Sequence, residues 1–354
     1  MGLTRRLVSA ATARPRVYVV EAPGGGAVRM AVEDELDRRH WLAAESPASA
    51  DVLLLAGATP AVLVDAEQLL WSQLPGPRTR TTITDAREAA PALDRARRAL
   101  RDAEAVRRDA RQRPTDLVEP WVSMGHDDHA DTSHKHEDHH DGGGGGDHHH
   151  DHEGMDMAPG GVPLAGGAED RDGLEMDVLE HPLGPLLDRW PGGLQLTTSL
   201  HGDTVAEVEV RWWARTSVSS LADDRGGATD ALDAVATVLS LVGDERHARR
   251  ARRARRARRT CAEGLAGSVG RDAPGLRRRL RRLNRLGVLP GEAVSTLLRQ
   301  LDGDADPLDD DDLVAVLAGR DLGDVRLLVA SYAPLLRSRP HGSPSDLTEQ
   351  GSDV

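Results

Sequence analysis

Phenylalanine is absent from this sequence, and two tyrosines and six tryptophans are its only aromatic residues. An apolar core must therefore be built mainly from leucine, valine and alanine. The single cysteine, Cys261, excludes an intramolecular disulfide, a four-cysteine zinc site and an iron–sulfur cluster held by this chain alone. Such sparse use of cysteine is typical of a reducing compartment.

Long apolar runs are also missing. The most apolar stretch, residues 52–64, is too short to span a bilayer and contains Gly57 and Pro60. The arginines near the start of the sequence are not followed by the apolar core of a secretory signal. We therefore expect a cytoplasmic protein with no transmembrane segment of its own. Lys135 is the only lysine, so arginine supplies nearly all of the 45 positive charges that face 58 carboxylates, for a net charge of −13.

Short apolar runs alternate with helical periodicity in the first quarter of the chain. Strands are predicted at residues 16–20, 51–57 and 81–84, and helices at residues 27–39 and 61–74. This alternation predicts the α/β class, with a small flavodoxin-like domain of parallel strands and right-handed crossovers in residues 1–115. The last helix of this domain is predicted to run unbroken over residues 91–113, where Pro114 ends it.

The rest of the chain divides by composition. Residues 116–173 are rich in histidine, aspartate and glycine and cannot bury a core, so we expect a disordered linker. Residues 174–218 contain two alternating apolar runs on either side of Gly202, which predicts a β-hairpin. Residues 219–337 predict an α-helical, arginine-rich region whose last helix covers residues 311–336. The remaining residues, 338–354, are expected to be a disordered tail.

Ten of the fifteen histidines lie in the linker, interleaved with aspartates. The candidate metal ligands are His126, His129, His134, His136, His139, His140, His148, His149, His150 and His152. Imidazole binds nickel, zinc, copper and cobalt ions alike, and Met155 and Met157 add soft donors for Cu(I). The tract is therefore expected to bind divalent ions without selecting among them by geometry. The alternative is a low-complexity spacer whose metal binding is incidental.

The turn Gly24-Gly25-Gly26 follows the first predicted strand and precedes a helix, where it could hold a phosphate. A dinucleotide-binding turn needs a third glycine, but that position holds Arg29, and no P-loop lysine follows. The pattern favours a structural turn.

Arginine is concentrated in one predicted helix. The candidate basic patch consists of Arg249, Arg250, Arg252, Arg253, Arg255, Arg256, Arg258 and Arg259. Its three-residue period drifts around a helix and gives no clean amphipathic face. With the arginines of residues 277–282 it could bind a phosphate backbone, an anionic lipid surface or an acidic partner. No aromatic residues are interleaved with the arginines, so base recognition in nucleic acid is not expected. The alternative is a solvated helix paired with the aspartate-rich loop 302–312.

That loop begins like a calcium-binding EF-hand, but Pro307 replaces the required glycine and Leu313 the closing glutamate. Asp309–Asp312 are instead expected to begin a helix, where carboxylates complement the dipole. Histidines outside the linker are scattered, with no serine or cysteine nucleophile near them. Glu207 and Glu209 share a strand face and are expected to be solvated. Catalysis by this chain alone is therefore not expected.

Three segments of the first domain carry a family resemblance: residues 17–26 (VYVVEAPGGG), 46–57 (SPASADVLLLAG) and 73–78 (QLPGPR). They resemble the 20-kDa subunit of NADH:quinone oxidoreductase and the small subunit of [NiFe] hydrogenases. The resemblance implies a [4Fe–4S] cluster held by cysteines in the glycine turn and after the second and third strands. The matching positions here are Gly25 and Val28, in and just after the turn Gly24–Gly26, then Ala58 or Thr59, and residues 84–86. All the ligands are missing, so the fold is expected without its electron transfer.

Residues 184–186 and 193–210 are similar to the N-terminal β-segment of the 49-kDa (large) subunit of the same complexes. The helices and cysteine pairs of that subunit do not follow, and residues 220–354 match neither subunit.

These resemblances predict a fusion of small- and large-subunit-like pieces joined by a metal-binding linker. Its expected function is that of a non-catalytic accessory, structural or assembly subunit of an NADH-quinone oxidoreductase-like or hydrogenase-like complex. The expected partners are the other subunits of this membrane-associated complex, which would hold the chain at the inner face of the membrane. The alternatives are a chaperone or storage protein for nickel, zinc or copper, a binder of anionic surfaces or nucleic acid through the arginine-rich helix, and a nucleotide-dependent enzyme that uses the turn Gly24–Gly26.

Overall fold

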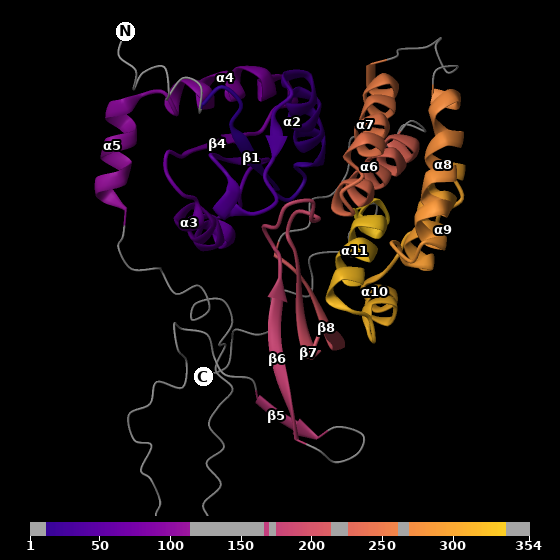
Figure 1. Cartoon of the computed structure of the whole chain (residues 1–354). Coiled ribbons are helices and arrows are strands. Elements are labelled where there is room, and N and C mark those ends of the chain that lie inside the picture. Colours follow the sequence, from indigo (N-terminus) through magenta and orange to yellow (C-terminus); the bar gives the residue numbers. More distant parts are fainter. Residues whose placement is uncertain (1–11, 114–165, 170–174, 214–225, 261–268, 338–354) are drawn as a thin grey trace, which may run out of the picture.

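The computed structural model describes residues 12–113, 166–169, 175–213, 226–260 and 269–337 (Figure 1). Its first part is the predicted parallel sheet. Strands β1 (Arg16–Glu21) and β3 (Val52–Ala56) are buried because nearly all their residues are apolar, and they pair in parallel. Strand β2 (Leu42–Ala43) joins one edge and β4 (Thr79–Ile83) the other, which gives the order β2-β1-β3-β4. The predicted α/β class is confirmed.

Helices cover both faces of this sheet because its side chains alternate between them. Helices α2 (Gly26–Arg39) and α4 (Ala89–Ala99) pack on the face that carries Val17, Val19, Val52 and Leu54. On the other face, the core contains Tyr18, Val20, Leu53 and Leu55 together with α3 (Val64–Gln73), which follows a 3₁₀ turn at Ala61–Leu63.

The prediction of one helix over residues 91–113 was wrong. The chain forms α4 and then a separate helix, α5 (Ala103–Gln112). The break arises because the Asp102 carboxylate accepts hydrogen bonds from the backbone N–H groups of Glu104 and Ala105 and caps the start of α5.

An antiparallel sheet follows, in the order β5-β6-β7-β8. The predicted hairpin is confirmed as β7 (Leu194–His201) and β8 (Thr204–Trp212). Strand β6 (Glu175–Leu183) pairs with β7 and with the short β5 (Gly166–Glu169). Strand β5 lies inside the range that was predicted to be linker, and most of that range lies outside the described residues.

The helical region consists, in its described residues, of α6 (Gly226–Leu241), α7 (Glu245–Thr260), α8 (Val269–Arg285), α9 (Gly291–Asp302), α10 (Asp310–Leu317) and α11 (Leu322–Arg337). Ala248, Ala251 and Ala254 of α7 are buried in its core, so the three-residue repeat places small residues where α7 packs against α6. None of the helices in the described ranges combines the length and the apolar character needed to cross a membrane.

The antiparallel sheet packs its apolar face on α10 and α11, where Leu194, Leu196 and Val205 join Leu313 and Val329 in one core. The prediction of one helix over residues 311–336 was wrong, because the chain forms α10 and α11 with a break between them. The interruption pairs with the sheet, because the Gly319 N–H donates to the Val205 carbonyl and the Val205 N–H donates to that of Arg320.

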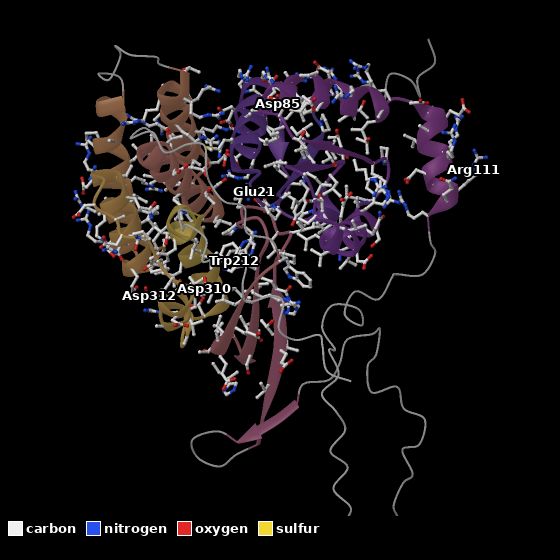
Figure 2. All side chains as sticks on the ribbon, turned by 180° about the vertical axis from the view of Figure 1, so that it is seen from behind. Glu21, Asp85, Arg111, Trp212, Asp310 and Asp312 are labelled. Carbon is white, nitrogen blue, oxygen red and sulfur yellow. The ribbon has the colours of Figure 1, made fainter. Side chains whose placement is uncertain are left out.

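Charged residues fix the start of α10. The expected helix start in the aspartate-rich loop is confirmed: the Asp309 carboxylate accepts a hydrogen bond from the Asp312 N–H at 2.8 Å. Figure 2 shows Asp310 beside Trp212 of β8, whose indole N–H donates to the Asp310 carboxylate at 3.1 Å.

The carboxyl ends of β1, β3 and β4 meet in a closely packed edge. The Ala22 N–H donates to the Ala56 carbonyl, and the Gly57 N–H donates to that of Ile83. Gly25 belongs to the turn after β1, and a Cβ atom at this position would lie 1.8 Å from the Ala56 carbonyl oxygen. Only glycine can bring the backbone of the turn this close to the end of β3.

We expect Gly25→Ala to destabilise the fold by about 1–3 kcal/mol or more, because the added methyl group must displace backbone atoms. Gly26→Ala is the matched control. Gly26 is the first residue of α2, and a Cβ atom there would lie 3.6 Å from its nearest neighbour, a carboxylate oxygen of Glu21. Urea unfolding of both variants checks this. Equal midpoints would show that the contact of the turn with β3 is not tight.

Candidate functional site

The α/β domain and the helical region meet through buried charges. Helix α2 has an apolar face on the sheet and an acidic face, with Glu33, Asp34 and Asp37, toward α7. Helices α6 and α7 supply Asp233 and Arg255 at the same place. We call Glu21, Arg29, Glu33, Asp34, Asp233 and Arg255 the interface charge network.

Arg29 links the end of the sheet to the helical region. Its Nε lies 2.7 Å from a carboxylate oxygen of Glu21, the last residue of β1, and its Nη1 lies 2.6 Å from Glu33. The other end of the guanidinium forms an ion pair with Asp233 of α6. Arg29 occupies the position at which a dinucleotide-binding turn would have its third glycine, and here that position serves to join the two parts of the molecule.

Arg255 of α7 is the largest fully buried side chain among the residues that the structure describes. Its Nη1 lies 2.8 Å from Glu33 and also pairs with Asp233, while its Nη2 lies 3.0 Å from Asp34. The same Nη2 donates to the Met30 carbonyl at 3.2 Å. Because each arginine contacts carboxylates from more than one helix, α2, α6 and α7 are fixed relative to one another.

Burial opposes every charge in this network, and the ion pairs offset it unequally. Burial alone would lower the pKa of Arg29, but Asp233 and Glu33 raise it well above its usual value. Burial would raise the pKa of Glu33, but Arg29 and Arg255 lower it. For Asp34, burial outweighs Arg255 and the pKa is raised. A buried set of ions of this kind holds the helices in one arrangement, because the loss of one partner leaves the remaining buried charges uncompensated.

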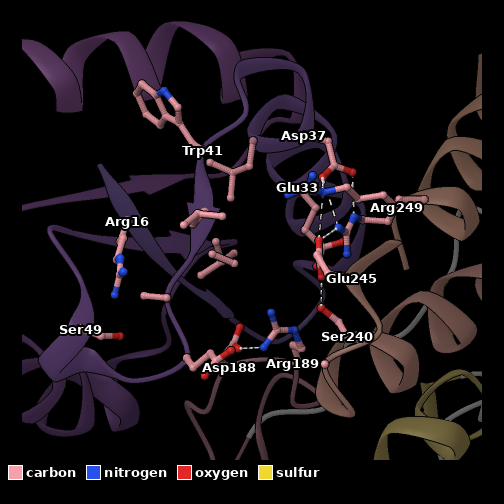
Figure 3. A pocket seen from close by; sticks show the side chains of 18 of the residues that line it. Arg16, Glu33, Asp37, Trp41, Ser49, Asp188, Arg189, Ser240, Glu245 and Arg249 are labelled. Atoms are coloured by element: carbon pink, nitrogen blue, oxygen red, sulfur yellow. Dashed lines mark hydrogen bonds and ion pairs between the residues drawn. The ribbon is translucent and has the colours of Figure 1, made fainter. Parts of the chain in front are cut away.

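A cleft of about 480 Å³ borders the network between the two parts (Figure 3). Arg16 and Trp41 line it from the α/β domain, and Glu245 and Arg249 line it from the helical region. Asp37 of α2 lies 2.8 Å from Nε of Arg252 and 3.5 Å from that of Arg249, which closes one wall.

The lining shows no nucleophile–base pair among the described residues. The Ser240 hydroxyl donates to the Glu245 carboxylate at 2.9 Å, and the Ser49 hydroxyl donates to the Ser46 carbonyl at 2.9 Å. The described residues that line this cleft include no histidine. The arrangement can therefore bind and orient charged groups, but it offers no activated hydroxyl.

The segment before β7 is seated on the end of β1. Asp188 forms an isolated β-bridge with Val20, and its N–H donates to the Tyr18 hydroxyl at 3.1 Å. A Cβ atom at Gly192 would lie 2.5 Å from the Ala22 carbonyl oxygen, so the two backbones are in direct contact. Arg189 lies 2.6 Å from the Asp188 carboxylate and has the left-handed φ of 55° that is rare outside glycine.

Two titrating groups in this contact have shifted pKa values. Burial raises the pKa of the Asp188 carboxyl to about 6, against the opposing effect of Arg189. Burial, with the charge of Asp188, raises the pKa of Tyr18 to about 12.

The segments in which the resemblance implies cluster ligands meet at the carboxyl ends of β1, β3 and β4. The turn Gly24–Gly26 lies against Gly57, where an added Cβ atom would be 3.0 Å from the Gly25 Cα. The Gly57 N–H donates a hydrogen bond to the carbonyl of Ile83, which directly precedes residues 84–86. The donors do not fit an iron–sulfur cluster: the described residues contain no thiol, and a side chain at Gly25 would overlap Ala56. Val28, the other matching position, lies in α2 and is buried in the apolar core.

The candidate basic patch is divided by the structure. Arg252 and Arg255 are buried and Arg249 is partly buried, and all three pair with carboxylates. Arg253 and Arg259 are exposed, and Arg250, Arg256 and Arg258 are intermediate. The acids that α7 meets belong mainly to α2, not to the aspartate-rich loop, which instead pairs Asp302 with Arg277 of α8.

The ten candidate histidines of the linker lie outside the described residues. Elsewhere, the described part of the chain contains no group of side chains arranged to hold a metal ion. Sequence reasoning missed the roles of Glu21, Arg29 and Asp233. A signal was available in α2: Glu33, Asp34 and Asp37 are one and four residues apart, which places three carboxylates on one face of a helix that an arginine-rich helix could neutralise.

No family model, characterised protein or solved structure matches the chain.

Arg255→Met should lower the free energy of unfolding by about 3–5 kcal/mol, because it leaves Asp233, Glu33 and Asp34 without their shared cation. Arg253→Met is the matched control: it lies two residues away on the same helix, is exposed, and should change stability by less than about 0.5 kcal/mol. Urea unfolding measures both. A loss of similar size in the two variants would mean that the network does not stabilise the interface.

The pH dependence of stability should reveal Asp188. The pKa of the Asp188 carboxyl is about 6 in the folded protein, whereas the ordinary pKa of an aspartate carboxyl is 3.8. The folded state binds more protons between these values, so the contribution of Asp188 to stability falls as the pH rises from 4 to 6, by about 3 kcal/mol at most. Asp188→Asn removes this titration. The stability of the variant relative to the wild type should therefore increase over this pH range in urea unfolding, and a constant difference would contradict the assignment.

Proposed function

We propose that the chain is a non-catalytic accessory, structural or assembly subunit of an NADH-quinone oxidoreductase-like or hydrogenase-like complex. One observation carries the proposal. The connection between the two pieces that resemble a large subunit, residues 184–186 and 193–210, contacts the domain that resembles a small subunit: Asp188 bonds to Tyr18 and Gly192 lies against Ala22. Leu186, which belongs to the first of these pieces, is buried in the same core as Tyr18. Pieces that resemble two subunits of one complex are thus paired within a single chain.

The chemistry at that contact supports a role without electron transfer. Where the resemblance places cysteines, this chain has a glycine packed on a carbonyl oxygen and a valine in the core. The neighbouring charges of Glu21 and Arg29 are satisfied by each other and by α6. The edge of the sheet is therefore used to join the two parts of the chain.

The proposed partners are the remaining subunits of the complex, at the inner face of the membrane. The chain would bind there through its partners, from the cytoplasmic side. The histidine tract, residues 126–152, would bind nickel, zinc, copper or cobalt ions during maturation of the complex. These residues lie outside the described ranges.

Affinity purification tests the proposal. The full-length tagged chain, purified gently from its own host with membranes included, should bring down subunits of a quinone-reducing or hydrogen-oxidising complex, which mass spectrometry identifies. A chain that lacks residues 126–152 should capture the same subunits, because the contacts described above do not involve the histidine tract.

Recovery of the chain alone, loaded with metal, would contradict the accessory function. Capture that disappears when the tract is deleted would point instead to metal-mediated association. The same tag on an unrelated host protein controls for non-specific recovery of membrane complexes.

A further inference from the structure

Helix α8 carries a stripe of arginines along one face. Arg278, Arg281, Arg282 and Arg285 follow the spacing of three and four residues that brings side chains together on a helix, and all four are exposed. The opposite face holds Leu276, Leu280 and Leu283, which are buried in the core with α6 and α9. The stripe faces outward, since α8 lies on the outer side of the helical region, away from the α/β domain (Figure 1).

The arginines of the stripe differ from the buried arginines of α7 and from their own neighbours on α8 in having no partners. Arg252 and Arg255 of α7 are paired with carboxylates of the interface charge network and its neighbour Asp37. On α8, Arg277 and Arg279 pair with Asp302 and Asp244. The four arginines of the stripe form no ion pair or side-chain hydrogen bond with any described residue. The sequence also contains no carboxylate between Asp272 and Glu292, so the charge of the stripe is not balanced along α8 and the turn that follows it.

Two exposed apolar side chains lie at the end of the stripe. Leu286 is 63 % exposed and Val288 is 41 % exposed, on either side of Gly287, where the chain turns toward α9. They are among the few large apolar side chains that the described residues expose. Cations next to exposed apolar groups are the combination that binds at a lipid headgroup layer, where the cations meet phosphates and the apolar groups enter the acyl boundary.

We propose that the α8 stripe, with Leu286 and Val288, is a docking surface for an anionic phospholipid membrane. Nucleic acid fits less well, because single-stranded binding uses aromatic platforms and α8 has no aromatic residue. The inference does not rest on the accessory function, since a chain that acts alone would dock by the same contacts. The sequence alone left an anionic lipid surface as one of several ligands of the arginine-rich helix, and the structure places the unpaired arginines on α8.

Vesicle flotation tests this surface with the full-length chain. We expect binding to phosphatidylcholine vesicles that contain about one third phosphatidylglycerol, weaker binding at high salt, and none to pure phosphatidylcholine. A chelator is present throughout so that the histidine tract cannot bridge to lipid through a metal ion. The test variant carries Arg278→Gln, Arg281→Gln, Arg282→Gln and Arg285→Gln. Each arginine near an anionic surface contributes about fivefold to the affinity. The variant should therefore lose at least tenfold in affinity even when only two of the four arginines contact the lipid.

The control variant removes the same charge elsewhere. It carries Arg95→Gln, Arg98→Gln, Arg107→Gln and Arg111→Gln, all exposed on α4 and α5. These helices lie on the side of the molecule opposite α8, where Figure 2 labels Arg111. Unchanged thermal unfolding of both variants shows that each is folded. A further variant, Leu286→Asn with Val288→Ser, should weaken binding several-fold at constant charge.

Equal losses for the two arginine variants would overturn the proposal, because they would show that only net charge matters. It is also overturned if a DNA or RNA oligonucleotide binds through the stripe while anionic vesicles do not.

Discussion

The fully buried guanidinium of Arg255 is the constraint on which the arrangement of the molecule depends. An arginine without access to water is tolerated only when carboxylates surround it, and here they come from α2 and α6. The position of α7 is therefore set by residues of a different domain. Arg29 repeats the arrangement from the opposite side, so the end of the parallel sheet and the helical region are fixed by two cations that share Glu33 and Asp233.

That constraint has a consequence for the edge of the parallel sheet. In folds of this class, the carboxyl ends of the strands usually provide the binding site, because loops with free polar groups converge there. Here Glu21 is paired with Arg29, Gly25 lies against Ala56, and Gly192 lies against Ala22. The edge is occupied by the chain's own backbone and charges. The surface of this edge is therefore an internal contact of the chain.

The sequence predicted those features that depend on neighbouring residues. Apolar runs gave β1 and β3, and the alternation around Gly202 gave the hairpin β7–β8. The break between α4 and α5 was missed although its cause is local. The helical pattern of the side chains continues through the break, but the Asp102 carboxylate caps a new helix there. The charge network could not be assigned from local pattern, because Arg255 and Asp34 are 221 residues apart and their pairing exists only in the folded chain.

The same argument separates the two arginine-rich helices. In sequence, α7 has the denser run of cations and is the more obvious basic surface, yet its buried arginines neutralise acids of α2 and present little charge to a partner. Helix α8 has fewer arginines, but carboxylates pair with only part of them. Attraction to a charged surface depends on cations that remain solvated and unpaired, because the fields of a paired cation and carboxylate largely cancel at distances greater than their separation. The capacity of an acidic chain to bind an anionic surface is therefore decided by which arginines its own fold leaves unmatched, and not by their number in the sequence.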